Sequence, residues 1–303
     1  MSKKAFLFPG QGSQYIGMAQ DLFENSVEAK EMIKTADDAL GVNLSYIMFN
    51  GPEEKLKQTE FTQPAIFLHS VILASLIRTL HPDAAAGHSL GEYSALVCAN
   101  AIQFYEAIKL VRVRGKAMQL AGEENKGTMA AVIGLAPNIV EECCTEASQV
   151  EICQCANFNS PGQIVISGSV QGVRKGMEIC KERGAKVREL VVSGAFHSPL
   201  MESAKTELKN ALEITNIYDG RIPVYANVTA NPEIAREEIK KSLYEQVTSP
   251  VRWEATIQNM INDGVEEFYE IGPGKVLQGL VKRINSDAKC FGIDKYSDME
   301  KYI

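Results

Sequence analysis

Gly87-His88-Ser89-Leu90-Gly91 is the stretch of this sequence that decides the fold. It matches the G-x-S-x-G pattern of a nucleophile elbow, a sharp turn between a strand and a helix that exposes a serine hydroxyl. Glycines on both sides of the serine relieve the crowding in such a turn. The amides at the start of the following helix can stabilise an oxyanion. Because the chain has 23 glycines, the pattern also fits a purely structural turn.

The sequence around the elbow favours an α/β fold with a mainly parallel sheet, because short apolar runs alternate with helical patterns. Residues 83–86 predict a short strand before the elbow, and a long helix should follow Ser89. We expect further strands at 4–8, 222–228 and 267–271. Helices are predicted at 15–23, 27–40, 236–247 and 253–263, and a further helix should run from the turn at 272–274 to residue 284. Another helix is predicted to begin at an N-cap, Thr62, with Pro64 in its first turn, and to end at residue 80.

The middle of the chain has a different order of elements. It predicts strands at 128–135, 151–157, 163–168 and 186–192, with helices at 137–147 and 170–183. This βαββαβ order is the ferredoxin-like pattern. We therefore expect a small ferredoxin-like domain over residues 125–195, inserted into a large α/β domain formed by residues 1–124 and 196–303.

Composition narrows the class of protein. With 303 residues, 45% hydrophobic residues and a formal net charge of -7, the chain is typical of a globular protein and a poor candidate for nucleic-acid binding. No apolar run reaches the roughly 20 residues needed to span a bilayer, and no signal peptide is recognisable. The 7 cysteines lack a metal-site spacing and indicate reduced thiols in the cytoplasm.

A serine nucleophile needs a base, and histidine is the usual choice. The chain has 4 histidines, which are His69, His81, His88 and His197. His197 follows the strand predicted at 186–192, and loops at strand ends are where α/β folds place catalytic groups. A hydrogen-bonded loop histidine fits the same position equally well.

Two other segments could contribute to a site. Gly10-Gln11-Gly12-Ser13-Gln14 follows the first predicted strand and matches neither a phosphate loop nor a dinucleotide fingerprint. Its amides could donate to an oxyanion, and a plain turn is the alternative. Arg112 and Arg114 lie two residues apart on a predicted helix, so they face different sides. One of them could hold a carboxylate or phosphate, while a solvated role is the ordinary expectation.

Seven segments carry a resemblance that covers nearly the whole chain in order. They are Phe8-Pro9-Gly10-Gln11-Gly12-Ser13-Gln14, Gly87-His88-Ser89-Leu90-Gly91-Glu92-Tyr93-Ser94-Ala95, Arg114-Gly115-Lys116-Ala117-Met118-Gln119, Asn157-Phe158-Asn159-Ser160-Pro161-Gly162-Gln163, Ala195-Phe196-His197-Ser198, Ser249-Pro250-Val251-Arg252-Trp253 and Glu270-Ile271-Gly272-Pro273-Gly274. Together they resemble malonyl-CoA:acyl carrier protein transacylases, which load malonyl groups for fatty-acid synthesis. The family's fold is an α/β-hydrolase-like large domain plus a ferredoxin-like small one.

The resemblance implies a role for each candidate residue. Ser89 would be the nucleophile and His197 the base, with the backbone amides of Gln11 and Leu90 as the oxyanion hole. Arg114 would hold the malonyl carboxylate. The remaining residues implied at the substrate site are Gln246, His88, Phe196 and Asn159. In related polyketide acyltransferases a phenylalanine at the position of Phe196 accompanies malonyl selectivity.

The resemblance also implies a cytoplasmic, monomeric enzyme that uses malonyl-CoA as substrate, binds no cofactor or metal, and has acyl carrier protein as partner. A polyketide-type malonyl acyltransferase, a serine thioesterase or esterase, and a catalytically silent binding module remain alternatives. Carrier proteins are acidic, so docking on this acidic chain requires a local basic surface. The candidates are the groups Lys181, Arg183, Lys186 and Arg188, and Lys275, Lys282 and Arg283.

Overall fold

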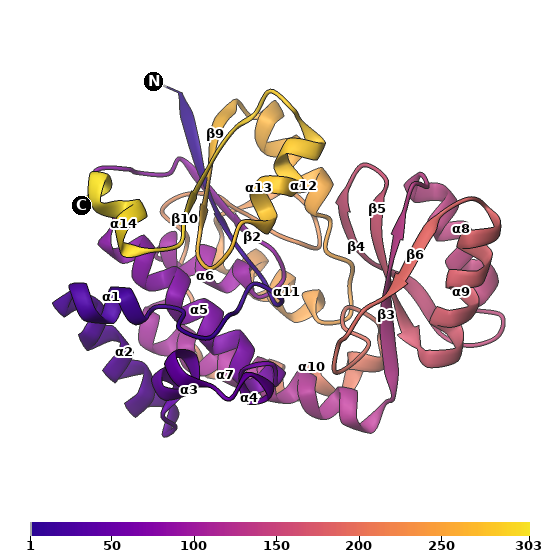
Figure 1. Cartoon of the computed structure of the whole chain (residues 1–303), viewed down its shortest axis with the longest axis horizontal. Coiled ribbons are helices and arrows are strands. Elements are labelled where there is room, and N and C mark those ends of the chain that lie inside the picture. The colour runs from indigo at the N-terminus through magenta and orange to yellow at the C-terminus, as the bar shows by residue number, and fades with distance from the viewer. Residues whose placement is uncertain (1) are drawn as a thin grey trace.

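The computed structural model describes residues 2–303, which form two sheets lying side by side (Figure 1). The larger sheet has the order β10-β9-β1-β2-β7-β8 and is parallel except for β8. Its strands are β1 (Lys3–Phe8), β2 (Ala84–Gly87), β7 (Val224–Tyr225), β8 (Pro232–Glu233), β9 (Val265–Ile271) and β10 (Lys289–Ile293). The mainly parallel sheet that the sequence predicts is confirmed.

The centre of this sheet is buried on both faces. Side chains of β1 alternate between two apolar clusters, with Phe6 and Phe8 on one face and Ala5 and Leu7 on the other. The three alanines of β2, which have weak strand propensity, are at most 4% exposed and pair with β1 in parallel register. Burial and pairing therefore compensate for the weak propensity of this strand.

Helices cover both faces of the larger sheet. The face with Phe6 and Phe8 packs in one cluster with residues of α2 (Val27–Leu40), α3 (Leu44–Asn50), α5 (Thr59–Leu76), α6 (Gly91–Cys98), α7 (Phe104–Glu124), α10 (Glu202–Ile214) and α11 (Arg236–Gln246). The opposite face packs against α12 (Trp253–Asn262) and α13 (Val276–Ile284). The shorter helices are α1 (Gln20–Asn25), α4 (Glu53–Leu56) and α14 (Tyr296–Met299).

The second sheet is antiparallel, with the order β4-β5-β3-β6. It consists of β3 (Gly127–Ile133), β4 (Cys153–Ser160), β5 (Gln163–Ser169) and β6 (Lys186–Glu189), and α8 (Pro137–Ala147) and α9 (Val170–Glu182) pack on it. The predicted βαββαβ order is confirmed. The domain boundaries at 124/125 and 195/196 stay a prediction.

Two predicted helices begin elsewhere. The prediction of a helix at 15–23 is wrong for residues 15–19, because turns occupy residues 16–19 and Ala19 has a left-handed backbone with φ 60°. α5 begins at Thr59 and ends at Leu76, so Thr62 is not its N-cap and Pro64 lies inside it. A proline leaves the carbonyl four residues earlier without its helical donor. Here that carbonyl, of Glu60, accepts a hydrogen bond from Arg112, which compensates for the loss.

Other predicted elements differ in length. The helix after Ser89 has only 8 residues, because the chain turns at Ala99 and Asn100 before α7 starts. The strands expected at 222–228 and 186–192 shrink to two and four residues. The sequence pattern did not predict α3, α4, α10, α14, β8 or β10. No helix within residues 2–303 combines the length and apolar character required to cross a membrane.

Candidate active site

Ser89 occupies the turn between β2 and α6, and its backbone is left-handed with φ 50°. The flanking glycines are required by contact distances. A Cβ at residue 87 would lie 1.8 Å from the carbonyl carbon of Gly91, and one at residue 91 would lie 2.0 Å from the carbonyl oxygen of Phe8. Only glycine fits at both positions, so the turn has the geometry of a nucleophile elbow.

The structure brings Ser89 and His197 into hydrogen-bond contact. Ser89 Oγ lies 2.8 Å from His197 Nε2, and His197 Nδ1 lies 2.9 Å from the backbone oxygen of Gln246. A carbonyl only accepts, so Nδ1 carries the hydrogen and Nε2 can accept the serine proton. Gln154 of β4 donates to the carbonyl of His197 at 2.7 Å, which ties this loop to the smaller sheet.

The electrostatic surroundings keep His197 neutral. The residue is 3% exposed, and burial, followed by the positive charge of Arg114, lowers its pKa to about 3. A neutral imidazole at physiological pH is the form that can act as a general base. The arrangement can therefore activate a serine hydroxyl without an acidic third residue.

Arg114 reaches the same site from α7 and is 1% exposed. Its guanidinium donates to Gln63 Oε1 at 2.7 Å, Gln246 Oε1 at 2.8 Å and Ser89 Oγ at 3.1 Å. All three acceptors are neutral, and no ion pair involves Arg114 within residues 2–303. A buried cation with neutral partners can accept a carboxylate beside the serine.

Arg112 lies two residues earlier on the same helix and has a different environment. It pairs with Glu60 at 2.9 Å, and its side chain is 19% exposed. The two arginines thus face different sides of α7, as their spacing predicts. Only Arg114 lines the cavity that contains Ser89 and His197.

The backbone amides of Gln11 and Leu90 belong to residues that line this cavity. Leu90 is the N-cap of α6, and Gln11 lies in the turn after β1, where Ser13 Oγ donates to the carbonyl of Gly10 at 2.8 Å. Within residues 2–303, neither amide donates to another backbone or side-chain acceptor. Two amides beside a reactive serine can stabilise an oxyanion.

His88 and Phe196 line the cavity that contains Ser89, and Asn159 contacts His88. His88 Nε2 lies 2.9 Å from Asn159 Oδ1, and the His88 ring packs against Trp253. Phe196 is 7% exposed and lines the cavity next to His197. Asn159 lines a neighbouring cavity that shares Gln11 and His88 with the first. All nine candidate residues therefore lie at one place, and no group of His, Cys, Asp or Glu within 2–303 has the arrangement of a metal site.

Comparison with known proteins places the chain in a family. Residues 5–295 match the model of the acyl transferase domain. The malonyl CoA-acyl carrier protein transacylase of Bacillus subtilis (strain 168) is 44% identical, over 99% of this chain and 96% of its own length. The chain belongs to the malonyl-CoA–acyl carrier protein transacylase family.

Solved structures of transacylases have the same fold. An acyl carrier protein S-malonyltransferase from Vibrio cholerae superposes with a TM-score of 0.94 at 41% identity, covering 99% of both chains. A malonyl-transacylase in complex with a type II PKS acyl-carrier protein gives a TM-score of 0.94 at 40% identity, covering 98% of both chains. The predicted fold class is thereby confirmed.

Two residues of this transacylase-family site were missed from the sequence. Asn227 Oδ1 accepts from the Ser89 amide at 2.6 Å, and Asn227 Nδ2 donates to the carbonyl of Gly87 at 2.6 Å. Glu92 Oε2 accepts from the Asn227 amide at 2.9 Å and from Gln246 Nε2 at 2.8 Å. Glu92 carried a signal, since it directly follows the elbow in a helix with few polar residues. Nothing in the sequence pointed to Asn227.

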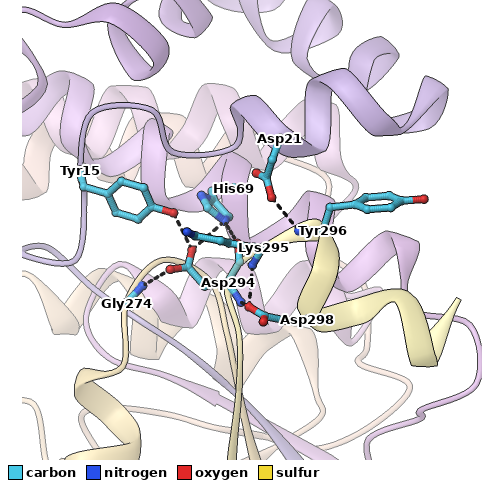
Figure 2. A network of polar contacts seen from close by, with 8 residues as sticks. All are labelled: Tyr15, Asp21, His69, Gly274, Asp294, Lys295, Tyr296 and Asp298. Carbon is cyan, nitrogen blue, oxygen red and sulfur yellow. Dashed lines mark hydrogen bonds and ion pairs between the residues drawn. The ribbon is translucent and has the colours of Figure 1, made fainter.

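A polar network around Asp294 joins segments that are far apart in the sequence (Figure 2). The Asp294 carboxylate accepts from the Tyr15 hydroxyl at 2.9 Å and from the Gly274 amide at 3.2 Å. The backbone oxygen of Asp294 accepts from His69 Nε2 at 2.7 Å, and His69 is fully buried. One aspartate therefore connects the segment after β1 with the turn between β9 and α13.

Proposed function

We propose that this chain transfers the malonyl group of malonyl-CoA to the phosphopantetheine thiol of an acyl carrier protein, through an ester on Ser89. One observation carries the proposal: a serine–imidazole pair at 2.8 Å lies beside a buried guanidinium that contacts the same serine oxygen. The malonyl CoA-acyl carrier protein transacylase of Bacillus subtilis named above, at 44% identity, supports it.

In the first half-reaction Ser89 Oγ attacks the thioester carbonyl while its proton moves to His197 Nε2. The C–O bond forms and the carbonyl oxygen becomes an oxyanion, which the amides of Gln11 and Leu90 receive. Each such donor typically lowers the barrier by roughly 3–4 kcal/mol. The C–S bond then breaks, and coenzyme A leaves as a thiol with the proton from His197.

The second half-reaction reverses these steps with a different thiol. His197 takes the proton of the pantetheine thiol, the sulfur attacks the Ser89 ester, and the proton returns to Ser89 Oγ as the C–O bond breaks. The carbonyl of Gln246 holds the imidazole in the same tautomer throughout, because it can only accept. Ping-pong kinetics with a covalent intermediate follow from this order.

Arg114 and Phe196 are proposed to select the acyl group. The guanidinium offers a two-pronged partner to a terminal carboxylate, which acetyl lacks. Phe196 reduces the space beside the carbon between the two carbonyl groups, so a methyl branch is disfavoured. Gln246, His88 and Asn159 complete the proposed substrate site.

The chain is further proposed to work as a monomer in the cytoplasm, without a bound cofactor. The seven free thiols support a reducing compartment. Polyketide synthesis is a second candidate pathway, favoured by the likeness to the malonyl-transacylase that binds a type II PKS acyl-carrier protein.

Intact-protein mass spectrometry tests the proposal directly. Mixing with malonyl-CoA should add one malonyl group to the wild type and none to Ser89→Ala. The adduct should persist until a holo acyl carrier protein is added and should then appear on that protein. Rapid loss of the adduct to water would indicate a thioesterase, and equal labelling by methylmalonyl-CoA would contradict the role of Phe196. Fatty-acid and polyketide carrier proteins tested side by side distinguish the two pathways.

A further inference from the structure

Glu92 is a buried carboxyl group that the proposed reaction does not use. It lies on α6 three residues after Ser89 and is 2% exposed. Its two hydrogen bonds, from Gln246 Nε2 at 2.8 Å and the Asn227 amide at 2.9 Å, both fall on Oε2. Within residues 2–303 no donor is hydrogen-bonded to Oε1. This second oxygen can therefore carry a proton without breaking either contact.

A single side-chain amide connects Glu92 with Arg114. Gln246 Oε1 accepts from Arg114 Nη2 at 2.8 Å, while Gln246 Nε2 donates to Glu92. Arg114 is 1% exposed, so both charged groups are removed from water. Buried charges are costly unless they are balanced. The Glu92 carboxylate is the anion that balances Arg114 across Gln246.

The other titratable groups around Glu92 do not provide this balance. Burial raises the pKa of Glu92 to about 7, the hydrogen bonds from Asn227 and Gln246 lower it, the nearby Glu233 raises it, and the positive charge of Arg114 lowers it. Burial also raises the pKa of Tyr93 and lowers the pKa of His197 to about 3, so both are neutral near pH 7. Arg114 is thus the cation that faces Glu92.

We propose that Glu92 takes up a proton from solvent when the carboxylate of a bound malonyl group pairs with Arg114. The inference rests on the proposed function, since it needs that carboxylate in the site. Before binding, Arg114 and Glu92 balance each other. The incoming carboxylate adds one negative charge, and protonation of Glu92 at Oε1 restores the original net charge. An acetyl group brings no charge and leaves Glu92 unchanged.

The size of the effect follows from Coulomb's law. Glu92 reaches Arg114 only through Gln246, by two hydrogen bonds of 2.8 Å each, so a carboxylate paired with Arg114 would lie on the order of 10 Å from Glu92. At an effective dielectric constant of about 20, this repulsion changes the protonation equilibrium of Glu92 by about tenfold. Starting from a pKa of about 7, binding at a pH of about 7.5 should take up about half a proton.

Isothermal titration calorimetry in buffers of different ionisation heat measures this proton directly. The Ser89→Ala protein allows malonyl-CoA to bind without reacting. We expect about half a proton taken up with malonyl-CoA and none with acetyl-CoA. Adding Glu92→Gln should abolish the uptake, because its amide can occupy the same positions without titrating. Adding Glu270→Gln, a change at a buried glutamate that does not act on the pKa of Glu92, should preserve it.

Binding of malonyl-CoA without proton uptake would overturn the inference, as would uptake that persists after Glu92→Gln. If circular dichroism shows that the protein with Glu92→Gln does not fold, the Ser89→Ala protein alone is used to test the inference. Its affinity for malonyl-CoA should then fall about tenfold between about pH 6 and pH 9, relative to acetyl-CoA, and a constant ratio contradicts the inference. Acylation of wild-type Ser89 by malonyl-CoA distinguishes failure of this inference from failure of the proposed function. If the wild type is not acylated, the proposed function itself is refuted.

Discussion

Replacing Arg114 with alanine should change which thioester the site accepts. The guanidinium makes hydrogen bonds of 2.7 and 2.8 Å to two glutamine side chains and 3.1 Å to Ser89 Oγ, all in a site shielded from water. Without it, a malonyl carboxylate would be buried without a cation. Removing one partner of a buried ion pair costs about 3–5 kcal/mol. We therefore expect kcat/KM for malonyl-CoA to fall by at least about 100-fold.

Acetyl-CoA provides the internal comparison, because it has no carboxylate to lose a partner. Its kcat/KM for acylation of Ser89 should change by less than about tenfold. Arg112→Ala is the matched variant: it removes the same side chain two residues away, where the partner is Glu60. This variant should affect both substrates equally. The reasoning is refuted if Arg114→Ala lowers both rates by the same factor, or if Arg112→Ala reproduces the change in preference.

Three further predictions address stability and docking. Gly91→Ala should destabilise the fold by about 3 kcal/mol or more in urea unfolding, because its Cβ would lie 2.0 Å from the backbone oxygen of Phe8. Gly279→Ala is the control: a Cβ there has nothing within 4 Å, so this change should be neutral or stabilising. The pKa of His197 is about 3 in the folded state and 6.5 in the unfolded state, so the unfolded chain binds a proton first as the pH falls. The free energy of unfolding should therefore decrease by about 3 kcal/mol from pH 7 to pH 4.5 through this residue. Urea unfolding of His197→Asn should lack that part of the loss, and an identical pH dependence would contradict it. Exchanging the exposed Lys186 and Arg188 for glutamate should slow transfer to carrier protein but leave acylation by malonyl-CoA unchanged, and unchanged transfer would exclude this surface.

The elbow could be predicted from sequence because its constraints are local. Gly87 and Gly91 are required by contacts within the turn and with the adjacent strand, so their spacing in the sequence carries the information. The alternation of strands and helices likewise determined the class of both sheets. The boundaries of α5 were different, because Pro64 is tolerated through a contact from Arg112, 48 positions later in the chain. A long-range compensation of this kind leaves no mark in the local pattern.

The polar residues behind the serine show the same limit. Asn227 is 138 residues from the amide that it holds, and its neighbours in the sequence do not indicate a catalytic setting. Asp294 connects Tyr15 and Gly274 across the fold through single hydrogen bonds. Such residues gain their role from the packing of β7, β9 and β10 around β1, so their function is a property of the assembled sheet.

The partner of His197 is the main-chain oxygen of Gln246. Because every amino acid supplies this oxygen, a point mutation at position 246 deletes the side-chain contacts and keeps the imidazole oriented. The usual aspartate of a triad can be lost in one codon change and carries a charge that varies with pH. In this molecule the acceptor of His197 Nδ1 is uncharged and is independent of the side chain at position 246, so exchange of that side chain removes the contacts with Arg114 and Glu92 but not this acceptor.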